Sequence, residues 1–312
     1  MKPIFSEVRS HFPNTTDAPF PSTAARMKIY KENALDLALS AITDCLLRID
    51  NFTSNEITHL ITVSCTGMYA PGVDIEIAHT LHLNSSTKRT AINFMGCYGV
   101  FNAIKVADAI CRSEHGASVL IVSVELCTIH FQKNMDIDNI LSNSIFSDGA
   151  AAVLVQSTPK QKKYFTLESF HNDLLPQTSK EMAWHIGDHG FDIVLSTYVP
   201  DLIQAGIKKF IDNSLNRYNA TLSDIDLYAI HPGGIKILEA CEKALNISRD
   251  SNKYAYHILR NYGNMSSATI LFVLKAIWDD INNQNHKNTI FSCAFGPGLT
   301  LEAMILKAYC VP

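Results

Sequence analysis

Residues 91–112 constrain the fold of this chain more than any other stretch. They begin as an apolar run typical of a buried strand, pass through glycines at 96 and 99, and continue with apolar residues at helical spacing. Cys97 lies in the turn, where the dipole of the following helix and its unpaired N–H groups favour thiolate over thiol. A strand, a sharp turn and a helix with a thiol between them indicate an α/β fold and a candidate nucleophile. The plainer alternative is that Cys97 is a small buried hydrophobic residue, as most free cysteines are.

Composition and charge exclude several classes of function. The 312 residues are 47% hydrophobic and 18% charged, which describes a compact folded protein and not a disordered one. A net charge of −4 argues against nucleic acid as the main partner. No apolar run is long enough to cross a bilayer, and no signal pattern opens the chain. We therefore expect a cytoplasmic protein without a membrane span.

The cysteines and histidines do not form a recognisable metal motif. Eight cysteines are scattered through the chain without a C-x-x-C pair, so neither a zinc ribbon nor a disulfide framework is indicated. His185 and His189 have the spacing of a metalloprotease motif, but Ile186 stands where that motif needs a glutamate. We expect no metal site.

Strand and helix patterns alternate along the chain, as an α/β fold requires. Strands are expected at residues 57–64, 117–126, 150–156, 164–170, 225–230, 289–294 and 299–306, and helices at residues 25–49, 73–83, 136–146, 200–215, 235–245, 251–262 and 266–280. Asp148 and Gly149 are expected to form a turn. The second half repeats this order of elements without a visible sequence repeat. Two α/β halves that meet at a shared core are the natural interpretation.

Three further segments place polar groups or glycines at the ends of expected elements. His231, in His-Pro-Gly-Gly, follows a buried strand and precedes a helix, a usual position for active-site groups in α/β folds. Asn264 lies just before another helix, and residues 294–298 form a glycine-rich connection between two late strands. Each segment also has a structural explanation, since Asn264 could simply cap the helix that follows it.

Taken together, these segments resemble the type III polyketide synthases, the chalcone synthase group of the thiolase superfamily. The resemblance runs from about Thr23 to the C-terminus, with the family's order and approximate spacing. The segments that carry it are Cys65-Thr66-Gly67, Pro71-Gly72-Val73-Asp74, Gly96-Cys97, Glu125, the Phe146-Ser147-Asp148-Gly149-Ala150-Ala151-Ala152 run, His231-Pro232-Gly233-Gly234, the 263–268 segment and the 295–300 segment. Ketoacyl-ACP synthase III enzymes share a Cys-His-Asn set, but they typically read His-Gln-Ala-Asn at the histidine. The His-Pro-Gly-Gly segment therefore favours the polyketide synthase branch.

The resemblance implies a thiolase-like fold of two similar α/β halves, packed as α-β-α-β-α layers. Residues 1–160 would form the half that carries the nucleophile, and residues 161–312 the half that carries the histidine and asparagine. It also implies a homodimer that binds small CoA thioesters, malonyl-CoA and an acyl-CoA, and needs no bound cofactor.

The implied reaction is a decarboxylative Claisen condensation. Cys97, paired with His231, would hold the starter acyl group as a thioester. His231 and Asn264 would donate hydrogen bonds to the oxyanion that forms when malonyl-CoA loses CO2. The product would be a polyketide of pyrone, resorcinol, phloroglucinol or chalcone type, which sequence alone does not distinguish.

The family pattern also implies residues that line the substrate pocket. Phe146 and Phe191 match the two aromatic residues that separate the CoA tunnel from the reaction chamber. The other positions are Cys65, Cys127, His130, Met182, Ser266, Phe295, Gly296, Pro297 and Gly298. Because His130 and Met182 are bulkier than the residues usual in the plant enzymes, we expect a smaller or differently shaped chamber.

One departure from the family pattern concerns the N-terminus. Several dozen residues that usually precede this point, including the first strand of the N-terminal half, are not recognisable. We expect either that the natural protein is longer, which we favour, or that this is a divergent short form. A missing central strand would leave unpaired backbone groups in the sheet, each costing roughly 1–3 kcal/mol. Two alternatives remain: a ketoacyl-ACP synthase III-like enzyme, or a catalytically silent thiolase-like dimer partner.

Overall fold

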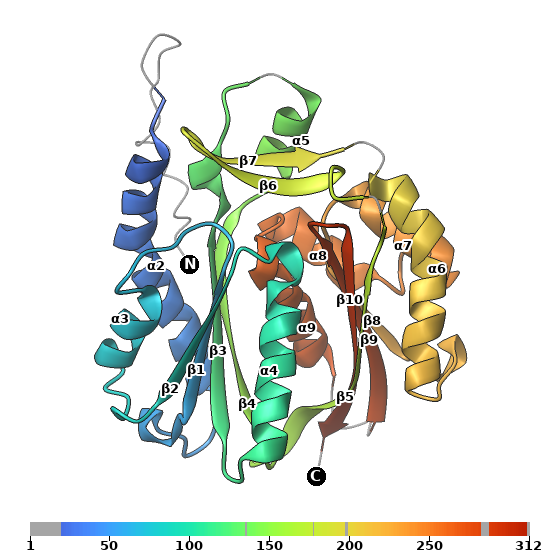
Figure 1. Cartoon of the computed structure of the whole chain (residues 1–312). Helices are drawn as coiled ribbons and strands as arrows, with labels where there is room; N and C mark the ends of the chain where they lie inside the picture. The colour runs from blue at the N-terminus through green and yellow to red at the C-terminus, as the bar shows by residue number, and fades with distance from the viewer. Residues whose placement is uncertain (1–19, 135, 177, 197–198, 282–286, 311–312) are drawn as a thin grey trace.

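A computed structural model describes residues 20–134, 136–176, 178–196, 199–281 and 287–310 of the chain (Figure 1). Its α-helices are α2 (Thr23–Leu46), α3 (Val73–Thr80), α4 (Gly99–Ser113), α5 (Ile137–Ile145), α6 (Val199–Arg217), α7 (Ile235–Leu245), α8 (Lys253–Tyr262) and α9 (Thr269–Asp280). Its strands are β1 (His59–Ser64), β2 (Lys88–Asn93), β3 (Ser118–Leu126), β4 (Asp148–Gln156), β5 (Lys163–Leu174), β6 (Met182–Gly187), β7 (Gly190–Leu195), β8 (Leu227–Ile230), β9 (Lys287–Gly296) and β10 (Thr300–Cys310). Short 3-10 helices are η2 (Ser54–Glu56), η3 (Gly96–Tyr98), η4 (Cys127–His130), η5 (Leu222–Asp224) and η6 (Ser266–Ala268).

The first sheet has the strand order β2-β1-β3-β4. β1 pairs in parallel with β2 on one side and with β3 on the other, and β4 runs antiparallel to β3. β1 and β3 are hydrogen-bonded directly to each other, and among the described strands β4 pairs on one side only, with β3.

Two expectations for this sheet were wrong. The strand before the nucleophile is mostly exposed and not buried, because β2 is an edge strand that pairs only with β1. Asp148 and Gly149 do not form a turn, because they pair with Leu126 and Glu125 as the first residues of β4. An alanine-rich run that continues the pairing therefore overrides the turn preference of Asp-Gly.

The second sheet has the order β5-β10-β9-β8. β10 pairs antiparallel with both β5 and β9, whereas β8 runs parallel to β9. The parallel pairing places the carboxyl end of β8, and the residue that follows it, beside the middle of β9.

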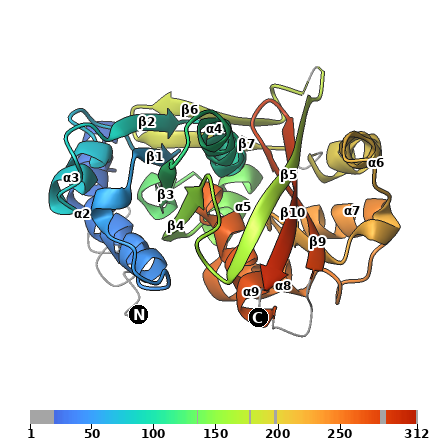
Figure 2. The same ribbon diagram turned by 90° about the horizontal axis from the view of Figure 1, so that it is seen from below.

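Helices and sheets alternate as layers (Figures 1 and 2). α2 and α3 cover one face of the first sheet, α4 and α9 lie between the two sheets, and α6 and α7 cover the far face of the second sheet. β3 shows why this works: Val119 and Ile121 face the central core, while Leu120 and Val122 face α2. A strand covered on both faces needs a continuous apolar run, as the sequence of β3 provides.

The hairpin β6–β7 lies outside both sheets, and Figure 1 shows it across the upper end of the molecule. Sequence patterns did not predict it. Its strands are six residues each, and the Gly187–Gly190 turn joins them. This hairpin and α5 lie on the side of the molecule where the site described below is found.

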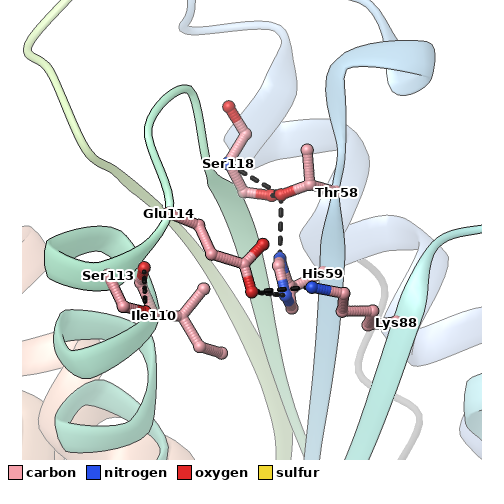
Figure 3. A network of polar contacts seen from close by, with 7 residues as sticks. All are labelled: Thr58, His59, Lys88, Ile110, Ser113, Glu114 and Ser118. Carbon is pink, nitrogen blue, oxygen red and sulfur yellow. Dashed lines mark hydrogen bonds and ion pairs between the residues drawn. The ribbon is translucent and has the colours of Figure 1, made fainter.

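A polar network at the opposite end of the first sheet ties four elements together (Figure 3). The Thr58 hydroxyl accepts a hydrogen bond from the Ser118 N–H at 3.0 Å and contacts His59 Nδ1 at 2.9 Å. Glu114, just after α4, accepts from Lys88 Nζ at 2.6 Å and lies 3.6 Å from His59 Nε2. The network holds the starts of β1, β2 and β3 to the end of α4.

Candidate active site

Cys97 lies in η3, directly before α4, as the sequence predicted. Gly96 has a φ of +78°, and a Cβ at this position would lie 2.3 Å from Pro297 Cδ. Only glycine allows both this backbone conformation and this contact. A Cβ at Gly296 would likewise lie 2.5 Å from the Tyr98 ring and 3.6 Å from the Cys97 nitrogen. The glycine-rich connection after β9 therefore packs directly against the nucleophile turn.

The surroundings of the Cys97 sulfur disfavour the thiolate that the start of the following helix was expected to favour. Burial raises its pKa to about 12, and the Glu125 carboxylate adds to the rise. Hydrogen bonds from Ser266 and Asn264 to the sulfur oppose the rise. The helix start does not outweigh the loss of water around the sulfur. Attack by Cys97 therefore requires a group that removes the proton.

Asn264 lies between α8 and η6, and its backbone is fixed on both sides. Its N–H donates to the Ile145 carbonyl and its own carbonyl accepts from the Ser147 N–H, both at 2.9 Å. The side-chain Oδ1 accepts from the Ser266 N–H at 2.9 Å and from the Thr269 hydroxyl at 3.3 Å. Since the oxygen is occupied in this way, the Nδ2 amide hydrogens remain to donate beside the Cys97 sulfur.

His231 follows the last residue of β8, and its N–H donates to the Cys293 carbonyl of β9 at 2.8 Å. The imidazole is buried, and neither ring nitrogen has a hydrogen-bond partner among the residues that the structure describes. Burial lowers the pKa of His231 to about 3, so the ring is neutral. The expected Cys97–His231 hydrogen bond is not made in this structure. Buried, unpaired ring nitrogens are costly, and a substrate oxygen or a thiol proton would satisfy them.

Glu125 supports the site from behind, a role that the sequence did not predict. Its carboxylate is fully buried at the end of β3 and accepts from the Cys65 N–H at 2.9 Å and the Thr66 hydroxyl at 2.8 Å. It also accepts from the Ser267 N–H at 3.4 Å and from the Ser267 hydroxyl. Burial raises the pKa of Glu125, and these hydrogen bonds oppose the rise. Glu125 thereby joins the loop after β1 to η6, which follows Asn264.

Four of the expected pocket residues line one cavity of about 80 Å³ between α5 and the β6–β7 hairpin. These residues are Cys127, His130, Phe146 and Phe191. Trp184 and Ile193 line it too, although the sequence did not single them out. No sequence pattern pointed to them, because the pairing of Trp184 with Ile193 in the β6–β7 hairpin brings the two residues together at the cavity.

The remaining expected residues do not line this cavity, and neither do Cys97, His231 and Asn264. Cys65 Sγ accepts from the Gly96 N–H at 3.0 Å, and Ser266 contacts the Cys97 sulfur. Phe295 and Met182 pack against the core under α6 and α7. Gly298 donates its N–H to the Met182 carbonyl at 3.3 Å. Met182 thus packs against the second sheet, and Trp184 is the β6 residue that reaches the cavity.

A second, much larger groove of about 3780 Å³ runs over β4 between α2 and the α8–α9 pair. Cys97, His231 and Asn264 do not line it. Over the described parts of the chain, no helix is long and apolar enough to cross a membrane. The same residues contain no group of three or more His, Cys, Asp or Glu side chains that could hold a metal ion.

Comparisons with known proteins place this chain in a family. The chalcone and stilbene synthase N-terminal domain matches residues 3–159, and the C-terminal domain of the same family matches residues 166–310. An alpha-pyrone synthesis polyketide synthase-like protein, Pks18 of Mycobacterium tuberculosis, is 32% identical over 284 residues, covering 90% of this chain and 72% of Pks18. A putative chalcone synthase of Bacillus subtilis is 30% identical, with 90% and 80% covered.

A solved structure agrees with these matches. The C-terminal type III polyketide synthase domain of Steely1, a type I/III hybrid from Dictyostelium, aligns with a TM-score of 0.85 at 28% identity. The alignment covers 93% of this chain and 80% of that domain. The mixed α/β, thiolase-like fold and the resemblance found in the sequence are confirmed. The chain belongs to the chalcone and stilbene synthase family of type III polyketide synthases, which are condensing acyltransferases.

Proposed function

We propose that the chain extends an acyl-CoA starter with malonyl-CoA by decarboxylative Claisen condensation. The observation that carries this proposal is the pair of donors on the C-terminal side of the site. Asn264 has its amide oxygen occupied and its Nδ2 hydrogens beside the Cys97 sulfur, and buried His231 has no partner for its ring nitrogens. A hydrogen-bond donor beside the thiol and a buried imidazole with unpaired nitrogens would together suit an oxyanion that forms next to an acyl thioester.

Loading begins with a neutral thiol and a neutral imidazole. As Cys97 Sγ attacks the carbonyl carbon of the starter thioester, His231 takes the thiol proton, and the carbonyl becomes an oxyanion. The bond to the CoA sulfur then breaks, and the proton on His231 passes to the departing CoA thiolate. The product is an acyl-Cys97 thioester and free CoA, with the histidine neutral again.

Extension uses His231 and Asn264 as hydrogen-bond donors. When malonyl-CoA loses CO2, the electron pair of the broken C–C bond moves onto the thioester oxygen as an enolate. The N–H groups of His231 and Asn264 stabilise this oxygen, so no strong general base is required. The enolate carbon attacks the acyl-Cys97 carbonyl, and Cys97 leaves as a thiolate. That thiolate can attack the new CoA thioester directly and begin another cycle.

Several finer features are inferred from the family. We infer that the layers represent two related α/β halves that meet near residue 160, as the boundary between the two matched domains supports. CoA thioesters would be the substrates, and a homodimer and a cytoplasmic location stay predictions. Among the implied product types, the name of the mycobacterial relative favours a pyrone.

The test is product analysis by mass spectrometry after incubation with malonyl-CoA and a panel of acyl-CoA starters, with Cys97→Ala as control. We expect polyketide products from the parent chain and none from the variant. Extension only when malonate is carried on acyl carrier protein would support the ketoacyl-ACP synthase III-like alternative. A folded chain that forms no product with either donor would contradict the proposal and leave the silent-partner alternative.

A further inference from the structure

Cys65 lies beside the nucleophile turn, and the proposed condensation has no step that uses its thiol. The Gly96 N–H donates to Cys65 Sγ at 3.0 Å, and the Cys65 thiol donates to the Gly96 carbonyl at 3.4 Å. That carbonyl oxygen is only three covalent bonds from the Cα of Cys97. Both sulfurs also contact the same hydroxyl group, that of Ser266. The Cys65 and Cys97 side chains are therefore immediate neighbours in the folded chain.

The surrounding contacts hold the two cysteines in these places. Gly96, between them, packs directly on Pro297, and the Cys65 N–H donates to the Glu125 carboxylate at 2.9 Å. Cys65 is 3% exposed, whereas Cys97 as a residue is partly exposed, although protein atoms surround its sulfur. A small oxidant that enters from solvent therefore meets Cys97 first, and Cys65 is in place to react with the product.

Cys127 is a third thiol near the site, and its position differs from that of Cys65. It is the first residue of η4 and lines the cavity between α5 and the β6–β7 hairpin. Cys65 instead contacts the backbone of Gly96, the residue that directly precedes the nucleophile. The geometry therefore favours Cys65 over Cys127 as a covalent partner for Cys97.

We propose that Cys65 is a resolving cysteine, which forms a disulfide with Cys97 when hydrogen peroxide oxidises the nucleophile. Cys97 Sγ attacks one oxygen of the peroxide, the O–O bond breaks, and the departing hydroxide takes the thiol proton and leaves as water. Cys65 Sγ then attacks the sulfur of the Cys97 sulfenic acid, the S–O bond breaks, and a second water leaves with the Cys65 proton. The two thiols lose two electrons in total, and one peroxide becomes two waters.

The disulfide would protect the nucleophile. A sulfenic acid without a neighbouring thiol is oxidised further to sulfinic and sulfonic acids, which dithiols do not reduce. A disulfide stops the oxidation at a stage that a dithiol reverses, and it blocks Cys97 until then. Burial raises the pKa of Cys97 to about 12, so little of the reactive thiolate is present at neutral pH and the oxidation needs an excess of peroxide.

The experiment treats the chain with excess hydrogen peroxide, alkylates the remaining thiols and identifies the state of each cysteine by peptide mass. We expect a Cys65–Cys97 linked peptide from the unsubstituted chain. Dithiothreitol should remove the link and restore alkylation of Cys97. Cys65→Ser should instead accumulate Cys97 sulfinic acid, so dithiothreitol should restore alkylation at least about tenfold less than in the unsubstituted chain.

Cys127→Ser is the matched control, because it removes a buried thiol near the site and should leave the linked peptide and the recovery unchanged. A link from Cys97 to Cys127, direct formation of sulfinic acid in the unsubstituted chain, or a Cys97 thiol that stays reduced would each overturn the inference. If Cys65→Ser does not fold, the linked peptide of the unsubstituted chain decides alone. No CoA thioester is used, so the result is independent of whether the chain forms a polyketide.

Discussion

The two sides of the active site are built differently. On the N-terminal side, the nucleophile turn is surrounded by contacts. Gly96 packs on Pro297, and its N–H donates a hydrogen bond to Cys65 Sγ. Glu125 accepts hydrogen bonds from the loop after β1 and from η6. On the C-terminal side, the imidazole of His231 is buried, and its ring nitrogens have no partner among the described residues. The first side fixes where the acyl group is attached. The second side holds donors that are left for the substrate.

Removal of the C-terminal donors should have the largest effect. We expect His231→Ala or Asn264→Ala to slow decarboxylation of malonyl-CoA by about 10²–10³-fold, because each takes one hydrogen-bond donor from the enolate oxygen. The measurement is release of labelled CO2. Thermal stability of His231→Ala should fall only by the cost of the cavity that the buried ring leaves, since the ring makes no hydrogen bonds to lose. If His231→Ala lost much of its stability but still released CO2 at the full rate, His231 would be a structural residue and not a donor to the substrate.

Glu125 tests the opposite side of the comparison. Glu125→Ala leaves the Cys65 N–H, the Thr66 hydroxyl and the Ser267 groups without their acceptor. Each buried group left unpaired costs about 1–3 kcal/mol. Because several groups lose their acceptor, the free energy of unfolding should fall by a few times this amount. Urea denaturation measures it. Glu125→Gln, which keeps one acceptor oxygen, should lose less, and an unchanged midpoint in both variants would refute the supporting role.

The lowered pKa of His130 predicts that the stability of the chain depends on pH. Its folded-state pKa is about 4, below the ordinary value near 6.5, so the unfolded chain binds more protons between these values. The contribution of the neutral His130 ring to the free energy of unfolding is therefore fully present above about pH 6.5. It is lost as the pH falls toward 4, at up to about 1.4 kcal/mol per pH unit. Urea denaturation at pH 7 and pH 5 should show a smaller difference for His130→Gln than for the unsubstituted chain. Equal differences would contradict the neutral ring, whose Nδ1 accepts from the Phe191 N–H and whose Nε2 donates to the Thr66 carbonyl.

Substitutions in the polar network of Figure 3 should have the smallest effect on stability. Thr58→Val leaves the Ser118 N–H without its acceptor and should cost about 1 kcal/mol of unfolding free energy. Lys88→Ala, the control, removes only an exposed ion pair to Glu114 and should change stability by about 0–1 kcal/mol. Neither variant should alter acylation of Cys97. If either did, the contacts that fix the nucleophile would extend further than the site described above.

Sequence patterns predicted the features that depend on neighbouring residues. The turn at Gly96-Cys97 was predictable because a strand, a glycine and a helix follow one another, and β3 because it is apolar on both faces. The raised pKa of Cys97 was not predictable, since it depends on burial against residues such as Asn264 and Ser266, about 170 positions later in the chain. The hairpin β6–β7 was missed because two six-residue strands with charged and glycine residues between them give no clear period. For that reason Met182 was singled out and Trp184 was not.

The most direct test of the division between the two sides is decarboxylation of malonyl-CoA by Cys97→Ala, measured beside Asn264→Ala. The account predicts that Cys97→Ala forms no polyketide but still releases CO2 and forms acetyl-CoA, because His231 and Asn264 act on the enolate without the thiol. It predicts that Asn264→Ala loses most of this activity. Decarboxylation that disappears in Cys97→Ala and persists in Asn264→Ala would contradict the account.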